Sequence, residues 1–213
     1  MKEIIIIEHP FSRYYLTELR NELSETKHFS ETLDRLSYVM AGFAYSSVEL
    51  KQKKVQTPLE MTTGFSIPKK IVLVPILRAG TGLLKGFVDL APDPIISHIG
   101  IYRNEETLEP VKYYFRFPKN YDKKKIDVYV LDPMIATGGS MIYTLKVLKD
   151  IGIKNVKVVS VLCAPEGLEA IDREFKGKDF KIEIYTCSID KKLNKSGYIL
   201  PGLGDAGDRY FGT

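Results

Sequence analysis

Hydrophobic positions along the chain occur in short β-branched runs that alternate with longer segments of helical spacing. The runs typical of buried strands are residues 4–7, 71–77, 95–101, 128–131, 156–162 and 180–186. Apolar residues spaced three or four apart predict helices over 11–23, 31–50, 83–90, 142–151 and 165–175. Strands and helices alternate from about residue 71 to 186, which predicts an α/β fold with a mainly parallel central sheet flanked by helices.

Two segments fall outside this alternation. Residues 53–58 are expected to form an edge strand, and residues 64–68 a turn. Residues 102–110 are polar without an apolar period, and an extended pattern resumes over 111–117. We therefore expect a hairpin-like excursion over about 102–117, of the kind that acts as a lid over a reactive site.

The most informative stretch follows the strand at 128–131. An acid, Asp132, stands at the strand end, and a loop, Ala136-Thr137-Gly138-Gly139-Ser140, leads into the next helix. Glycines let backbone N–H groups approach a ligand, and the helix start adds unpaired N–H groups and a positive dipole end. Such a loop can be an ordinary turn before a helix. A carboxylate at a buried strand end is costly unless it binds something, so the pattern favours a sugar that carries both hydroxyls and a phosphate.

A second strand-to-helix turn carries a cation. The strand at 71–77 leads into Arg78, followed by Gly80 and Gly82. This arginine could be a surface residue or a helix cap. If the two strands are neighbours, their turns face one crevice at the carboxyl ends of the strands, where Arg78 could clamp a diphosphate. Arg103, at the base of the excursion, is a second candidate for the same group.

The C-terminal segment 197–209 is rich in glycine. Gly202, Gly204 and Gly207 match the dinucleotide pattern G-x-G-x-x-G, but no helix-long segment follows and no ribose-binding acid can lie about 20 residues on. Ile199 and Leu200 supply apolar surface for a fold-back. Backbone groups displayed by such a loop can read the edge of a flat heterocycle such as a pyrimidine.

Composition sets wider bounds on function. The 213 residues fit one domain, 1–213, better than two. Thirty-one basic and 27 acidic residues give a net charge of +4, which suits phosphorylated substrates and is too diffuse to indicate nucleic acid. The two cysteines lack zinc-site spacing, and no apolar run reaches the roughly 20 residues of a membrane span. We expect a cytoplasmic protein.

Five blocks, in order, resemble the uracil phosphoribosyltransferases, a type I phosphoribosyltransferase family. The blocks are 75–80, 100–107, 132–140, 164–167 and 197–208. Most type I phosphoribosyltransferases have two adjacent acids in the third block, whereas here Pro133 follows Asp132, as in the uracil-specific variant. Thr81 and Ile135 stand where other members often carry other apolar residues.

The resemblance implies the type I phosphoribosyltransferase fold and transfer of the phosphoribosyl group of phosphoribosyl pyrophosphate (PRPP) to N1 of uracil. The products would be UMP and diphosphate, in pyrimidine salvage, with Mg²⁺ held mainly by PRPP and placed near Asp205. The implied PRPP-binding residues are Arg78, Arg103, Asp132, Pro133, Met134, Ile135, Ala136, Thr137, Gly138, Gly139, Ser140 and Asp205. The implied uracil-binding residues are Ile199, Gly204, Asp205 and Ala206, in a base-binding tail over 197–210.

The same likeness suggests a homodimer or homotetramer and a nucleotide effector such as GTP. No general base stands out, and none is assigned. Two alternatives stay open: a phosphoribosyltransferase for another base, and a non-enzymatic regulator on the same fold that binds RNA and senses a pyrimidine nucleotide. The second predicts a coherent basic face, whereas the charges of this chain are mixed.

Overall fold

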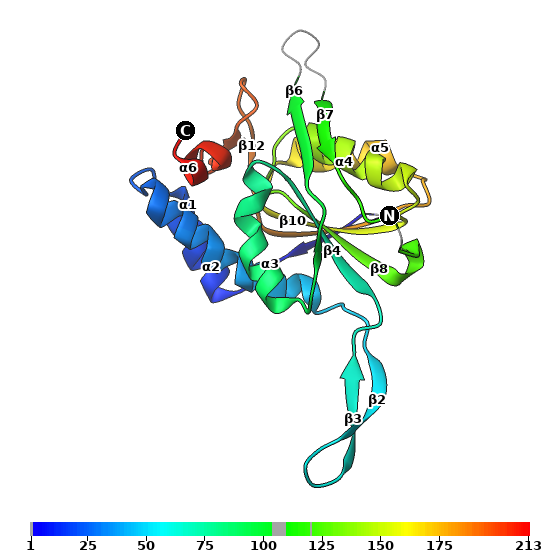
Figure 1. Cartoon of the computed structure of the whole chain (residues 1–213). Coiled ribbons are helices and arrows are strands. Elements are labelled where there is room, and N and C mark those ends of the chain that lie inside the picture. The colour runs from blue at the N-terminus through cyan, green and yellow to red at the C-terminus, as the bar shows by residue number, and fades with distance from the viewer. Residues whose placement is uncertain (1, 104–109, 120) are drawn as a thin grey trace.

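A computed structural model describes residues 2–103, 110–119 and 121–213, in which helices cover both faces of a central sheet (Figure 1). The strands of this nine-stranded sheet are β1 (Lys2–Ile6), β4 (Lys70–Leu77), β5 (Ile95–Ile96), β6 (Ile99–Arg103), β7 (Pro110–Phe115), β8 (Ile126–Leu131), β9 (Met134–Ile135), β10 (Asn155–Cys163) and β11 (Lys181–Ile189). Their order is β1-β11-β10-β8-β4-β6-β7, with β5 beside β4 and β9 beside β10. Every pair is parallel except β6 with β7. The predicted fold class is confirmed.

The helices and short 3-10 turns are α1 (Pro10–Arg20), α2 (Thr26–Tyr45), η1 (Ala79–Leu83), α3 (Leu84–Leu90), η2 (Lys123–Lys125), α4 (Gly139–Asp150), α5 (Pro165–Phe175) and α6 (Ala206–Phe211). One core cluster joins α1, α2 and α3 to one face of the sheet, and a second joins α4 and α5 to the other. Central strand β4 shows why both faces are covered. Ile71 and Leu73 belong to the first cluster and Val72 and Val74 to the second, because side chains alternate along a strand.

The strands that precede the two predicted turns are direct neighbours. β4 pairs with β8 in parallel, with Pro75 opposite Leu131. Both strands therefore deliver their following turns to the same edge of the sheet, as the sequence predicted.

Several predicted boundaries were wrong. The helix expected over 31–50 is α2, which begins at Thr26 and ends at Tyr45. Its first turn is fixed by Phe29, which is buried under the guanidinium of Arg209. The strand expected over 95–101 is divided into β5 and β6, which both pair with β4; between them the Ser97 hydroxyl donates to the Arg116 carbonyl.

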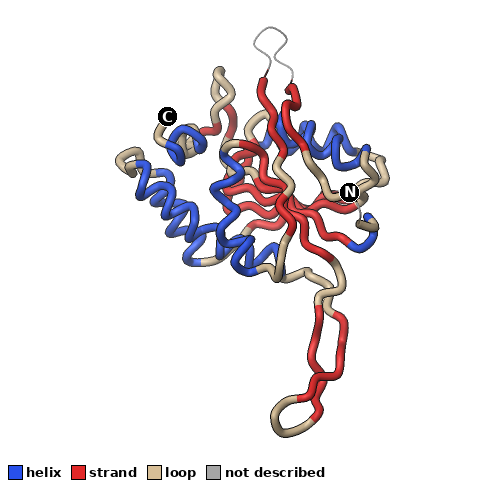
Figure 2. Tube along the Cα trace, in the orientation of Figure 1, coloured by secondary structure: helices blue, strands red, loops and turns tan. Residues whose placement is uncertain are grey.

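Of the turn predicted over 64–68, residues 64–66 belong instead to a strand. β2 (Lys51–Gln56) and β3 (Met61–Ser66) form an antiparallel hairpin that projects from the body (Figures 1 and 2). Gly64 serves close approach, since a Cβ there would lie 2.8 Å from Cγ2 of Val55 on the facing strand. The reversal lies at Thr57, whose hydroxyl accepts the N–H groups of Leu59 and Glu60.

The excursion predicted over 102–117 contains the antiparallel pair β6 and β7, so its hairpin character is confirmed. Its tip, residues 104–109, lies outside the described residues, and the lid role stays a prediction. Within the described ranges, no helix has the length and apolar character needed to cross a bilayer.

Candidate active site

The turn after β4 lies in close contact with the end of β8 because Gly80 has no side chain. A Cβ on Gly80 would lie 2.3 Å from the Leu131 carbonyl oxygen, so only glycine allows the β4 turn to pass this close to the end of β8. Arg78 begins the first turn and Asp132 the second. The peptide bonds Leu77–Arg78 and Leu200–Pro201 are cis.

The hydroxyl-rich loop is shaped by a second close approach. Gly138, the N-cap of α4, has φ +82°, and a Cβ on it would lie 2.9 Å from the Gly167 carbonyl oxygen. In return, a Cβ on Gly167 would lie 2.3 Å from the Ala136 carbonyl oxygen. The loop and the first turn of α5 therefore interlock backbone against backbone. Thr137 and Ser140 are exposed at the mouth of this loop, beside the start of α4.

The Asp132 carboxyl is largely shielded from water. Burial raises its pKa from 3.8 to about 7, and the Met134 N–H, which donates to Oδ1 at 3.4 Å, lowers the pKa only in part. The structure thus contains a partly protonated carboxyl at neutral pH, at the edge of the sheet where ligands of parallel α/β folds bind.

The C-terminal segment folds back over this edge. β12 (Lys192–Leu193) and β13 (Ile199–Leu200) form a small hairpin, and a Cβ on Gly197 at its tip would lie 3.8 Å from Cγ2 of Thr137. Asp205 then caps α6, with Oδ1 accepting the N–H groups of Gly207 and Asp208 at 2.8 and 3.0 Å. The short helix α6 was not predicted from the sequence.

Two adjoining cavities result. One, of about 100 Å³, is lined by residues 132 and 134–141; the other, of about 230 Å³, is lined by Ala79, Asp132, Met134, Ala136, Gly197, Tyr198, Ile199, Gly204, Asp205, Ala206 and Gly207. They share Asp132, Met134 and Ala136. The first is lined by the Thr137 and Ser140 loop and the start of α4, and the second mainly by glycine and apolar residues together with Asp132 and Asp205. The carboxyl of Asp132 lies where they join.

Comparison with known proteins agrees with this geometry. The family model described as "Uracil phosphoribosyltransferase" matches residues 6–213. The uracil phosphoribosyltransferases of Dictyoglomus turgidum and Streptococcus salivarius are 44% and 43% identical to the chain, over 99% and 100% of both chains, respectively. The chain belongs to the uracil phosphoribosyltransferase family.

Solved structures share the fold of this chain. The structure of the AQ2163 protein from Aquifex aeolicus is 37% identical, covers 98% of this chain and 97% of its own, and superposes with a TM-score of 0.86. The adenine phosphoribosyl transferase from Trypanosoma brucei, at 14% identity and a TM-score of 0.53 over 92% of this chain and 89% of its own, shares the fold. The fold is thus that of type I phosphoribosyltransferases.

The family-motif residues gather at this one edge, with one exception. The loop from Asp132 to Ser140, apart from Pro133, and the residues Ile199, Gly204, Asp205 and Ala206 line the two cavities. Arg78 lies beside them, with Nη2 3.6 Å from Oδ1 of Asp208 and its guanidinium 5.5 Å from the centre of the Phe211 ring. Arg103 ends β6, and its side chain lies outside the described part of the structure.

Pro133, in the place of a second acid, is buried and contributes its backbone. Its carbonyl accepts the Leu162 N–H at 3.0 Å, which carries the loop alongside β10. Asp132 is therefore the acid that this block presents to the cavities. In the ranges that the structure describes, no cluster of three or more His, Cys, Asp or Glu residues could by itself hold a metal ion.

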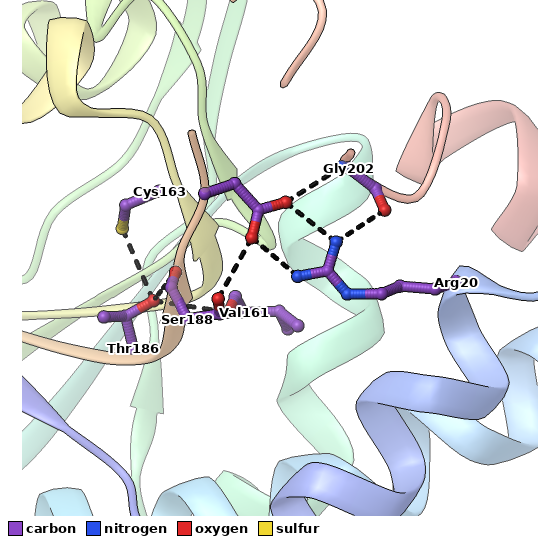
Figure 3. Close-up of polar contacts among 7 residues, drawn as sticks. Arg20, Val161, Cys163, Thr186, Ser188 and Gly202 are labelled. Atoms are coloured by element: carbon purple, nitrogen blue, oxygen red, sulfur yellow. Dashed lines mark hydrogen bonds and ion pairs between the residues drawn. The ribbon is translucent and has the colours of Figure 1, made fainter. Parts of the chain in front are cut away.

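Sequence reasoning missed the side chains that anchor the family's C-terminal tail. Arg20 and Asp190 form a bidentate ion pair that also holds Gly202 (Figure 3). Arg209 donates to the carbonyls of Leu19, Leu203, Asn21 and Ser24, at the end of α1 and in the tail. A signal for Asp190 existed, because it follows strand β11 as Asp132 follows β8. No sequence pattern links Asp190 to Arg20, which lies 170 residues away.

The first turn of α5 contacts the tail as well as the loop. Glu166 Oε1 accepts the Leu193 N–H from β12 at 2.9 Å, and this bond is the main reason that the pKa of Glu166 is lowered. The block at 164–167, which carried no chemistry in the sequence, thus supports both cavities.

Proposed function

We propose that this member of the family transfers the phosphoribosyl group of PRPP to N1 of uracil and releases diphosphate. The observation that carries the proposal is the pair of adjoining cavities with one carboxyl between them. A hydroxyl-rich helix start suits a phosphate, a carboxylate suits ribose hydroxyls, and a backbone-lined hollow suits a flat base. A phosphoribosylated pyrimidine has these parts in this order.

On the PRPP side, the 5′-phosphate would lie in the loop from Ala136 to Ser140. N–H groups at the start of a helix of this length lack partners within the helix, and the Thr137 and Ser140 hydroxyls add donors. Asp132 would accept the ribose hydroxyls. Because hydroxyl donors favour the ionised carboxylate, PRPP binding should lower the pKa of Asp132 and release a proton near pH 7.

Arg78 would bind the diphosphate. Its present partners are weak, since Arg78 and Asp208 are both more than half exposed, and a solvated pair at 3.6 Å contributes little. The guanidinium can therefore turn to a diphosphate and bind it through two parallel hydrogen bonds. Arg103 is proposed for the same group on the strength of the family motif.

On the base side, uracil would lie in the larger cavity against Ile199 and Ala206, which are buried. Backbone groups around Gly204 and Asp205 would match the alternating donors and acceptors of the pyrimidine edge. Both cap bonds of Asp205 go to Oδ1, so Oδ2 would be available to bind PRPP.

The residues support an electrostatic mechanism. Loss of diphosphate develops positive charge on the ribose and negative charge on the leaving group, so the Asp132 carboxylate near the sugar and Arg78 near the diphosphate both favour the transition state. The folded-back tail would exclude water from the ribose carbon. No side chain is assigned as a general base.

Magnesium fits this site as a companion of PRPP. Asp132 and Asp205 both line the larger cavity, and carboxylate and phosphate oxygens are the ligands that Mg²⁺ prefers. The protein offers too few donors for a complete cage, so PRPP would supply most of the ligands. When bound, Mg²⁺ neutralises charge on the diphosphate.

The remaining elements of the proposal concern the whole molecule. We propose a single domain over 1–213 that works in the cytoplasm as a homodimer or homotetramer, with a lid over about 102–117 and a possible nucleotide effector such as GTP. The exposed apolar residues of the β2–β3 arm, which include Met61 and Phe65, support association between copies.

Product analysis tests the proposal. The protein is incubated with PRPP and Mg²⁺ and, in separate reactions, with uracil, cytosine, adenine, guanine or xanthine, and the nucleotides are identified by mass spectrometry. We expect UMP from uracil and no product from the purines. A purine nucleotide without UMP would establish a phosphoribosyltransferase for another base, and no nucleotide from any base would favour a non-enzymatic role.

A further inference from the structure

The larger of the two cavities, in which we place uracil, is the base-side cavity. The loop beside it is held at Gly202 by an ion pair. Arg20 donates from Nη1 and Nη2 to the two carboxylate oxygens of Asp190 at 2.8 and 2.6 Å. Asp190 Oδ2 accepts the Gly202 N–H at 2.8 Å, and Arg20 Nη1 also donates to the Gly202 carbonyl at 2.9 Å. Both polar backbone groups of one glycine are thus bound by two side chains of opposite charge, as Figure 3 shows for the arginine and the glycine.

The ion pair is attached to rigid parts of the fold. Arg20 is the last residue of α1, and Asp190 directly follows β11. Asp190 is 6% exposed, accepts the Ser188 hydroxyl at 3.0 Å, and donates its own N–H to the Cys163 carbonyl at the end of β10. Burial raises the pKa of Asp190, but the bonds from Arg20 and Gly202 outweigh it, so the pKa is lowered overall and the group is ionised.

The anchored glycine controls the shape of the loop. Gly202 has φ +63°, and a Cβ on it would lie 2.1 Å from the Ile199 carbonyl oxygen, so the chain reverses tightly here. The residues on either side of this reversal, Ile199 and Gly204 with Asp205, line the base-side cavity. Neither Arg20 nor Asp190 lines either of the two cavities.

We propose that Arg20 and Asp190 are positioning residues for the base. They hold the loop over 199–204 in the conformation that recognises uracil. Asp205, which serves PRPP as well, is held separately by its bonds from the Gly207 and Asp208 N–H groups, so the pair does not act on PRPP. The part of this inference that concerns KM and kcat rests on the proposed transfer to uracil. It requires that loss of the pair affects the two substrates unequally, whereas a merely structural role would weaken both together.

The test removes both charges at once. A single neutral substitution would leave a buried charge without its partner, so the main variant is the double change Arg20→Met with Asp190→Leu. Arg20→Lys keeps the charge but loses the two-pronged geometry. Arg35→Met is the control, because it removes an arginine on α2 that pairs with Glu31 at the surface and lies outside both cavities.

Steady-state kinetics give the first measurement. In the double variant we expect KM for uracil to rise at least tenfold, with kcat at saturating uracil within threefold and KM for PRPP within twofold of wild type. Arg20→Lys should show a smaller rise in the uracil KM, and Arg35→Met should match wild type. An unchanged uracil KM, or an equal rise in both KM values, would overturn the proposal.

Hydrogen–deuterium exchange of the substrate-free protein gives the second measurement. Amides in residues 199–204 should exchange at least tenfold faster in the double variant, while those in residues 137–145 keep the wild-type rate. This reading needs no activity. A wild-type protein that makes no UMP would refute the proposed function, whereas unchanged exchange over 199–204 would refute the anchor. If the double variant does not fold, Arg20→Lys decides by the same two measurements.

Discussion

Replacing Asp132 with asparagine should stabilise the substrate-free protein at pH 8. The carboxyl has a pKa of about 7 in the folded protein because burial disfavours its charge. Asparagine has nearly the same shape, carries no charge, and can keep an oxygen toward the Met134 N–H. The variant therefore avoids the cost of ionisation without creating a cavity or leaving the Met134 N–H without an acceptor.

The sign and size follow from linkage. In the unfolded chain Asp132 ionises near 3.8, whereas the folded protein retains the proton up to about 7, so stability falls as pH rises from about 4 to 7 and is level above that. A rise from 3.8 to about 7 corresponds to about 4 kcal/mol at 1.36 kcal/mol per pKa unit. Asp132 retains some contact with solvent, which screens its charge, so we expect about 1–4 kcal/mol at pH 8.

Urea unfolding followed by circular dichroism measures this difference. The free energy of unfolding of Asp132→Asn minus that of wild type should widen from pH 5 to pH 7 and then stay constant to pH 8. Asp179→Asn is the control, because the hydrogen bond from Lys154 lowers the pKa of this exposed acid and keeps it ionised over the whole range. A difference for Asp132→Asn that does not change with pH, or a variant less stable than wild type at pH 8, would refute the reasoning.

Further predictions concern the loop, the cation and the tail. Arg78→Ala should raise KM for PRPP by roughly 10–100-fold, the loss of charge-assisted hydrogen bonds, and leave the melting temperature near that of wild type. Gly167→Ala should destabilise the fold by about 1–3 kcal/mol and raise KM for PRPP, since its Cβ would lie 2.3 Å from the Ala136 carbonyl oxygen. Arg209→Met should cost about 1–3 kcal/mol in urea unfolding, because carbonyls such as that of Leu19 lose their donor. For wild type, calorimetry of PRPP binding at pH 7 in two buffers of different ionisation enthalpy should reveal proton release.

Each of these outcomes can fail independently. Normal turnover of Arg78→Ala at low PRPP would remove the diphosphate role. An unchanged melting temperature for Gly167→Ala would show that the loop and α5 do not interlock. Gly177→Ala is not a suitable control for that variant because Gly177 has φ +72°, so Gly42→Ala, where a Cβ meets nothing within 4 Å, serves instead.

The sequence predicted the elements whose cause is local. Asp132 was identified because an acid after a buried strand is unusual, and the strand neighbours followed from strand and helix order. Gly64 was misread as a turn residue, since glycine also serves close strand approach, and only the position of Val55 distinguishes the two roles. The start of α2 was missed because the reason lies in Arg209, at the far end of the chain.

Residues that line the larger cavity were named from the sequence, whereas the residues that support its loop were missed. Ile199, Gly204 and Asp205 lie in one short segment that carries a family motif, so that segment of sequence was enough to find them. The pairing of Arg20 with Asp190 joins residues 170 positions apart, and neither has a motif around it. Contacts of this kind depend on the closed fold and leave no periodic signal.

The first turn of α5 has a consequence for engineering base preference. Its glycine packs against the loop over 136–140, and its glutamate accepts an N–H from the β12–β13 hairpin, which carries Ile199. A designer who exchanges only the last few dozen residues for those of a relative would break that second contact and leave the first in place. The smallest transplantable unit for changing which nucleobase is accepted is therefore the C-terminal segment together with residues 164–167.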